Sequence, residues 1–210
     1  MRWLLVWACS AVVVVGGATS IAAGAVAASP AETVARVVLK PPQVASDVTL
    51  EAFPGGDKVA GEVTLDLCGY AFRTEAVRLA RLQVVYARRG TALISNEVVA
   101  YKPGGAMSAM RELRAAIAQC PAGFAASTVP GMGQLKNSIE QIRAPGLLPG
   151  SIAFLDRIIQ RLDGKTSRWD TIFVFQARRD VLSAVYGWGL AQMPLVRHAA
   201  VQAARNLKTI

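Results

Sequence analysis

The sequence predicts an α+β fold: a mostly antiparallel sheet with one long helix after the first hairpin, a C-terminal helix and one disulfide. Three observations lead to this prediction. Short alternating or β-branched runs recur between turn residues, an amphipathic helical pattern covers residues 106–120, and a second helical pattern covers residues 194–207. Strand-forming runs interrupted by only two helical patterns are typical of this fold class.

Residues 1–28 are predicted to be an export signal. Arg2 is followed by a stretch over residues 3–28 that contains no charged residue and ends in small side chains. A positive residue, an apolar core and small residues before a cleavage point are the features of a secretory signal peptide. The stretch also exceeds the roughly 20 apolar residues that span a bilayer, so an uncleaved anchor is the alternative.

Residues 29–210 are expected to form a single extracytoplasmic α+β domain, secreted or held in the cell envelope. Their length is sufficient for one hydrophobic core. The whole chain has a formal net charge of +9, and basic residues cluster over residues 73–89 and 157–168. This charge favours anionic partners such as lipid headgroups or acidic wall polymers. Nucleic acid is not expected, because the arginines lack interleaved aromatic residues and the protein is expected outside the cytoplasm.

The N-terminal half of the domain is expected to contain three strands. Residues 62–67 alternate apolar and polar side chains, which is the pattern of a half-buried strand. The runs 81–88 and 91–102 are rich in β-branched residues and are separated by Arg89 and Gly90, so an antiparallel hairpin is predicted. The other expected features are a lead-in over 31–39 that ends before Pro41 and Pro42, a turn at 54–57 and a short helix capped by Thr74.

The C-terminal half begins with the clearest helix, over residues 106–120. Its apolar stripe, with Glu112 on the opposite and wet face, consists of Met107, Met110, Leu113 and Ile117. Pro121 is expected to close this helix. The elements predicted after it are a loop at 122–133, a strand at 135–142, a run at 152–162 that fits either helix or strand, a hairpin of strands 169–177 and 181–188, and the helix at 194–207.

Cys68 and Cys120 are predicted to form a disulfide. They are the two cysteines that remain once Cys9 leaves with the signal, and exported proteins fold where thiols are oxidised. The bond would join the end of the long helix to the end of strand 62–67. The chain-entropy model gives about 4 kcal/mol of stabilisation for a loop of this length. Two free buried thiols are the alternative.

The residues that carry catalysis or bind metals are scarce, so the chain is predicted to be a non-enzymatic protein without metal or cofactor. Its single histidine is His198, which leaves no ligand set for zinc and no evident triad, and no Gly-x-Ser-x-Gly motif occurs. Carboxylate pairs such as Glu62 with Asp66 leave open a hydrolase that uses two acids.

The segment from Val63 to Cys120 resembles a known family. It contains TLDLCG at 64–69, ISNEVVAYKPGGA at 94–106 and Gln-Cys-Pro at the end of the long helix. In these motifs it resembles actinobacterial secreted proteins related to the extracellular sensor domain of the mycobacterial serine/threonine kinase PknH. The resemblance implies an α+β domain with a cleft that serves as a binding or sensing module. This chain departs in having no kinase segment and one disulfide where the kinase sensor domain has two.

The first functional hypothesis is an exported, non-enzymatic ligand-binding or sensor-like domain of the cell envelope. Its ligand would be a small molecule, a lipid or a wall polymer, and membrane contact would come through the N-terminal signal if it is uncleaved. The residues expected to contact the ligand, on the face of the sheet, are Tyr86, Asn96, Glu97 and Tyr101. Aromatic residues in the predicted strands, Trp169 and Trp188 among them, pack in the core or line a pocket. The alternatives are an envelope hydrolase that uses carboxylates and a structural or partner-binding protein.

Overall fold

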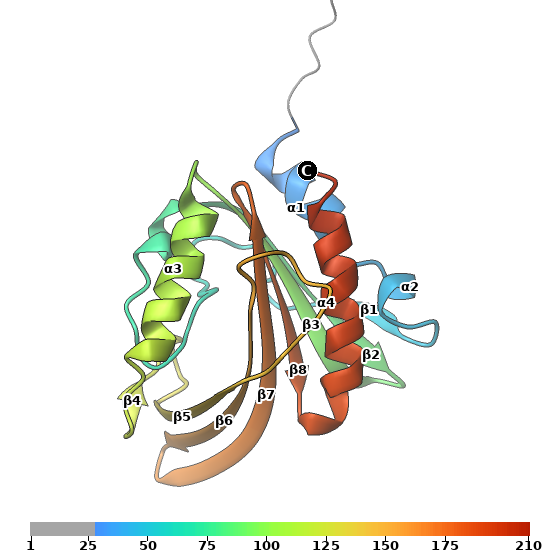
Figure 1. Cartoon of the computed structure of the whole chain (residues 1–210). Coiled ribbons are helices and arrows are strands. Elements are labelled where there is room, and N and C mark those ends of the chain that lie inside the picture. Colours follow the sequence, from blue (N-terminus) through green and yellow to red (C-terminus); the bar gives the residue numbers. More distant parts are fainter. Residues whose placement is uncertain (1–27) are drawn as a thin grey trace, which may run out of the picture.

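A computed structural model of the chain describes residues 28–210 (Figure 1). The predicted export signal lies outside the described residues, apart from Ala28. Within them, one eight-stranded antiparallel sheet has the strand order β1-β2-β3-β8-β7-β6-β5-β4. The α+β prediction is confirmed.

The elements have the following bounds. The strands are β1 (Thr49–Ala52), β2 (Arg78–Arg88), β3 (Thr91–Tyr101), β4 (Ala125–Ala126), β5 (Gln134–Gln141), β6 (Ile152–Leu162), β7 (Lys165–Arg178) and β8 (Val181–Trp188). The helices are α1 (Pro30–Val37), α2 (Pro41–Val44), α3 (Gly105–Ala118) and α4 (Met193–Leu207), with 3-10 turns η1 (Arg73–Val77) and η2 (Leu190–Gln192).

The sheet separates two hydrophobic clusters, because successive side chains of a strand point to opposite faces. In β8, Val181 and Val185 belong to the cluster that includes α4, whereas Leu182 and Tyr186 belong to the cluster that includes α3. Figure 1 shows α3 and α4 on opposite sides of the central strands. We call these two sides the α4 face and the α3 face.

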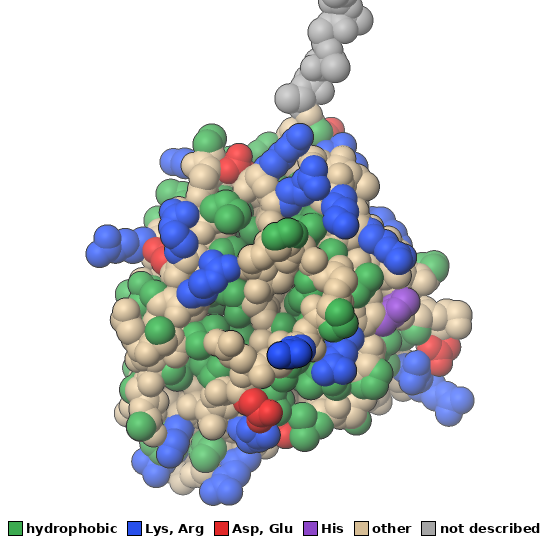
Figure 2. All heavy atoms as spheres, in the orientation of Figure 1, with side chains coloured by type: hydrophobic (Ala, Val, Ile, Leu, Met, Phe, Trp, Pro, Cys, Tyr) green, Lys and Arg blue, Asp and Glu red, His purple; other side chains and the backbone are tan. Residues whose placement is uncertain are grey.

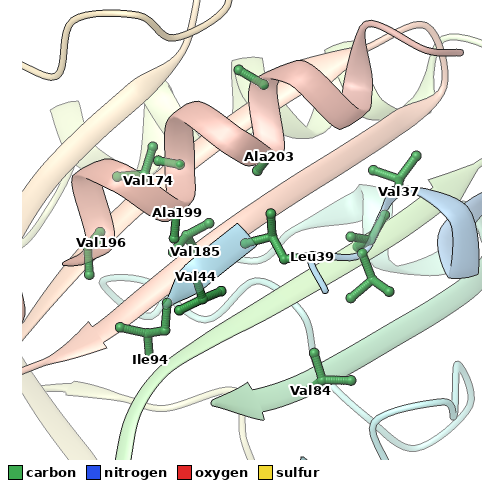
Figure 3. Close-up of a cluster of buried hydrophobic side chains, with 14 of the residues drawn as sticks. Val37, Leu39, Val44, Val84, Ile94, Val174, Val185, Val196, Ala199 and Ala203 are labelled. Atoms are coloured by element: carbon green, nitrogen blue, oxygen red, sulfur yellow. The ribbon is translucent and has the colours of Figure 1, made fainter. Parts of the chain in front are cut away.

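The α4 face is covered by α1, α2 and α4. Figure 3 shows Val196, Ala199 and Ala203 of α4 turned toward Val185 of the sheet. The helix can approach this closely because residue 187 is glycine: a Cβ there would lie 2.3 Å from Cγ2 of Val196. Small side chains on α4 and a glycine under them therefore set the spacing between this helix and the sheet.

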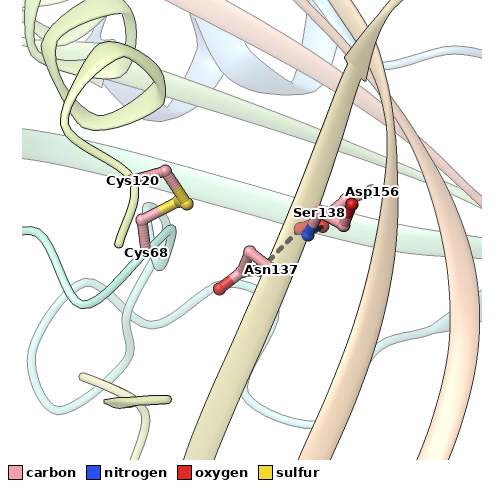
Figure 4. The surroundings of a disulfide bond; sticks show 5 residues. All are labelled: Cys68, Cys120, Asn137, Ser138 and Asp156. Atoms are coloured by element: carbon pink, nitrogen blue, oxygen red, sulfur yellow. Dashed lines mark hydrogen bonds between the residues drawn. A yellow bond between two sulfur atoms is a disulfide. The ribbon is translucent and has the colours of Figure 1, made fainter. Parts of the chain in front are cut away.

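The α3 face holds the disulfide. Cys68 and Cys120 are bonded with their Cα atoms 5.0 Å apart, as predicted (Figure 4). Cys120 follows the end of α3, and Cys68 lies in an irregular segment before η1. The bond therefore ties the helix to the chain that leads into β2.

The predicted strand at 62–67 is wrong, because these residues form no strand. Side chains take its backbone hydrogen bonds instead: the amides of Thr64 and Leu65 donate to the Glu75 carboxylate, at 3.0 and 3.2 Å. Leu65 and Leu67 are nevertheless buried among the α3-face residues. The alternation of apolar and polar residues therefore indicates a segment with one buried side. An irregular segment can have such a side as well as a strand.

Several other elements differ from the sequence predictions. The ambiguous run 152–162 is strand β6, while β1 and β4 at the sheet edges were not predicted. Glu112 is half-buried rather than on a wet face, because its carboxylate accepts hydrogen bonds from the amide and hydroxyl of Thr74. Met107, predicted in the apolar stripe, is 47% exposed.

Within residues 28–210, no helix combines the length and the apolar composition that crossing a membrane requires.

Candidate functional site

A pocket of about 380 Å³ lies on the α3 face of the sheet. Strands β2, β3, β6, β7 and β8 supply its floor, and two irregular segments supply its walls: residues 53–67, which we call the pocket wall, and the loop around Val129–Met132. The volume falls within the range of small-molecule sites.

Aromatic side chains make up much of the floor. Phe154 stacks on Phe173 with ring centroids 5.0 Å apart, and Phe173 meets Tyr186 edge-on at 5.4 Å. The other large apolar residues of the lining include Trp169, Trp188, Leu113, Met132, Leu135 and Ile158. A lining of aromatic and aliphatic side chains suits an apolar or aromatic ligand.

A buried ion pair forms the polar part of the floor. Arg81 Nε lies 2.5 Å from Glu97 Oε1, and the two side chains are only 2% and 3% exposed. The same carboxylate accepts hydrogen bonds from the hydroxyl of Thr64 at 2.8 Å and from the hydroxyl of Tyr186 at 2.7 Å. The remaining donors of Arg81 reach the carbonyl of Gly55 and the side chain of Gln83. The charges of Arg81 and Glu97 are therefore balanced by each other, and both side chains find hydrogen-bond partners within the protein, as buried ions require.

The pocket wall is held by a second arginine. Arg78 donates from Nη2 to the carbonyls of Val59 and Glu62, at 2.9 and 2.6 Å, and from Nη1 to Thr64 Oγ1 at 2.9 Å. Glu75, which accepts the two wall amides, pairs with Arg78 at 3.2 Å. Burial raises the pKa of Glu75, while the hydrogen bond from the Thr64 amide and the charge of Arg78 lower it.

The four residues predicted to contact a ligand fall on opposite faces of the sheet. Tyr86 and Asn96 lie on the α4 face, where the Tyr86 hydroxyl donates to the carbonyl of Leu39 at 2.6 Å. Asn96 Oδ1 accepts from the Leu39 amide at 3.0 Å. Glu97 and Tyr101 lie on the α3 face, and Glu97 alone of the four lines the pocket. Because Asn96 and Glu97 are neighbours in a strand, they point to opposite sides.

Tyr101 is buried beneath α3, and its hydroxyl has no hydrogen-bond partner among the described residues. Burial raises the pKa of Tyr101 far above its usual value, and the negative charges of Glu75 and Glu97 add to the shift. The hydroxyl thus carries the cost of leaving water without a compensating bond.

Replacing Tyr101 with phenylalanine is expected to raise the free energy of unfolding by about 1 kcal/mol, since it removes an unsatisfied buried hydroxyl. Tyr86→Phe is the matched control, because its hydroxyl is bonded to Leu39 and its loss should cost about 1–2 kcal/mol. Urea denaturation of both variants measures the difference. A loss in Tyr101→Phe as large as that in Tyr86→Phe would contradict the unsatisfied state of the Tyr101 hydroxyl.

A buried acid lies next to the pocket on β6. Asp156 accepts hydrogen bonds from Asn137 Nδ2 at 2.6 Å and from the Ser138 amide at 3.0 Å (Figure 4). Burial raises the pKa of Asp156, although these two hydrogen bonds oppose the shift. Its partner across the β6–β7 ladder is Thr171, which lines the pocket. Within residues 28–210, His, Cys, Asp and Glu side chains form no group of three that could hold a metal ion.

The basic residues seen in the sequence are distributed unevenly in space. In the first group, Arg78 and Arg81 are bonded into the pocket floor and wall, and Arg88 pairs with Asp47 at 2.8 Å. In the second group, Arg157 pairs with Glu140 at 2.9 Å, while Arg161 stacks over the ring of Phe124. The sequence therefore overstates how much of the first group is free to meet an anionic partner.

Sequence reasoning singled out Glu97 but missed its partners Arg81 and Tyr186. The alternation of side chains along a strand could have identified Arg81. Positions 81 and 83 of β2 and position 97 of β3 share a face of the sheet once the hairpin register is known. The register pairs Gln83 with Glu97, so Arg81 is the diagonal neighbour. Tyr186 belongs to the other hairpin, and the adjacency of β3 and β8 cannot be read from their sequence separation.

Comparisons with known proteins give a distant structural likeness. No protein-family model matches the chain, and no curated protein matches it. Among solved structures, the extracellular domain of PknH from Mycobacterium tuberculosis is similar over 83% of this chain and 95% of that one, with a TM-score of 0.48 and 13% identity. This is a distant structural resemblance, and we draw no functional conclusion from it.

Proposed function

We propose that the chain is an exported, non-enzymatic binding domain of the cell envelope whose pocket takes a neutral, largely apolar small molecule. The observation that carries the proposal is the composition of the pocket: an aromatic floor surrounds an ion pair that is already neutralised within the protein. A charged ligand at this floor would have to leave water without gaining an unpaired charge from Arg81 or Glu97 in return.

The hydrolase alternative has less support from the same residues. Three carboxylates line the pocket, those of Glu62, Asp66 and Glu97. Glu62 is half-buried, and Glu97 accepts hydrogen bonds from three side chains. Asp66 accepts from Ser127 and Thr128, at 2.5 and 2.8 Å. Asp66 and Glu97 thus hold the walls together, and this engagement of two of the three carboxylates favours a binding role over a reaction that uses two free acids.

The proposal is tested with N-phenyl-1-naphthylamine, a neutral fluorescent aromatic probe. Wild-type protein should enhance its emission in a saturable manner, because the probe enters an apolar pocket. Trp188→Ala should weaken the apparent affinity by roughly five- to tenfold, since it removes one ring of the lining. Leu79→Ala is the control, because Leu79 is also exposed, at 46%, but does not line the pocket.

Two outcomes would argue against the proposal. Absence of saturable binding would leave the structural or partner-binding role as the better interpretation. Equal loss in Trp188→Ala and Leu79→Ala would place the probe on the general surface rather than in the pocket.

A further inference from the structure

The end of the molecule at which α1 begins carries a basic surface. Arg36, Arg178, Arg179 and Lys208 border an open depression of about 570 Å³ between α1, the β7–β8 turn and the chain after α4. Three of them are exposed and Arg178 is half-buried. Figure 1 shows α1, the end of α4 and the tip of the β7–β8 hairpin together at this end, and Figure 2 shows Lys and Arg side chains gathered there. We call these four residues the basic end.

The positive charge of the basic end is not balanced by ion pairs. The salt bridges formed within residues 28–210 all involve other side chains. The acidic groups nearby are already engaged: Asp180 Oδ1 accepts from the Gly104 amide at 2.5 Å. The Glu32 carboxylate accepts from the Ser29 amide at 2.7 Å, and this hydrogen bond together with the charge of Arg36 lowers the pKa of Glu32. Both carboxylates keep their negative charge, so the four cations exceed these two neighbouring anions and leave a positive surface for an external anion.

The position of this surface relative to the apolar N-terminal stretch indicates which anion it meets. Residues 3–28 carry no charge, and only Ser29 separates them from Pro30, the first residue of α1. Ala28 itself borders the depression. When the apolar stretch lies in or against a bilayer, the basic end is consequently the part of the domain nearest to the lipid headgroups.

We propose that the basic end binds the anionic phospholipid headgroups of the membrane that receives the apolar stretch. Each Lys or Arg held near such a surface adds roughly fivefold to membrane affinity. This attraction acts within a Debye length, about 10 Å at 0.1 M salt, so it depends on the depression lying close to the end of the apolar stretch, as its contact with Ala28 indicates. The interaction is independent of the pocket, which opens on a different set of residues.

The opposite end of the sheet supplies a matched control. The β6–β7 hairpin lies at the end of the molecule away from α1 (Figure 1). Around it, four basic residues are exposed or half-buried: Lys136, Arg161, Lys165 and Arg168. Neutralising these four residues changes the net charge as much as neutralising the basic end, but at the other end of the molecule.

The test uses the full chain reconstituted in vesicles of phosphatidylcholine, with or without phosphatidylglycerol. Amide hydrogen exchange is followed in peptides that cover α1, the β7–β8 turn and residues 205–210. In the anionic vesicles, exchange there should slow at least threefold relative to neutral vesicles. The protection should disappear at 1 M salt, where the Debye length falls to about 3 Å.

Two variants, each with its four basic residues replaced by glutamine, show whether the protection depends on the position of the charges or on the net charge alone. The variant of the basic end should lose the protection, and the hairpin variant should keep it. Equal exchange in both kinds of vesicle, or equal loss in both variants, would overturn the proposal. The same protection by a soluble polyphosphate without vesicles would also overturn it, because the partner would then be a polymer. Failure of the full chain to remain bound to either kind of vesicle would overturn it too.

Discussion

Arg81→Met should lower the free energy of unfolding by about 3–5 kcal/mol, because it leaves the Glu97 carboxylate buried without its counter-charge. The two side chains are 2% and 3% exposed, so water cannot replace the lost partner. Arg81 also supports the pocket wall through the carbonyl of Gly55. Urea denaturation monitored by tryptophan fluorescence measures the loss.

Another arginine of the same strand gives the matched control. Arg88 pairs with Asp47 at 2.8 Å, but these side chains are 46% and 59% exposed. Arg88→Met should therefore cost less than about 1 kcal/mol. The double variant Arg81→Met with Glu97→Met should recover much of the loss, because neither charge then remains buried alone. A cost for Arg81→Met as small as that for Arg88→Met would show that Glu97 does not depend on its partner.

Replacing both Cys68 and Cys120 with serine is expected to remove up to about 4 kcal/mol of stability, because the bond closes a long loop in the unfolded chain. The two residues are separated by 52 positions. The measurement is the urea midpoint of the double variant compared with that of the oxidised wild type.

A reducing agent provides the internal control for this prediction. Dithiothreitol should shift the wild-type midpoint toward that of the double serine variant and leave the variant itself unchanged. A reductant effect of equal size on both proteins would mean that the midpoint shift does not come from the Cys68–Cys120 bond.

Local patterns predicted most of the sheet, because the two main hairpins are built from sequence neighbours. The turns at Arg89-Gly90 and Arg179-Asp180 separate β-branched runs, and the structure pairs each run with the next. The edge strands β1 and β4 escaped prediction because each has only a few residues. Strands this short form because a longer neighbouring strand offers them backbone hydrogen bonds, and their own residues show no recognisable pattern.

The candidate site was harder to predict because it depends on contacts between distant parts of the chain. Glu97 was selected as a strand residue, but what it does depends on Arg81 across one ladder and Tyr186 across another. Asn96 was selected beside it, although alternation alone places adjacent residues on opposite faces. Applying this alternation to the selected residues would have assigned Asn96 and Glu97 to different faces of the sheet.

The arginine-held pocket wall has a consequence for how a ligand gains access. Residues 59–65 form no rung of the sheet: they are held by Arg78 and Glu75, by the hydrogen bond from Thr64 to Glu97 and by the burial of Leu65. Local opening of such a segment costs less than unfolding of the whole domain. Opening of this stretch would therefore leave the strands paired, and we expect the residence time of a ligand to depend on these side-chain contacts rather than on the ladders of the sheet.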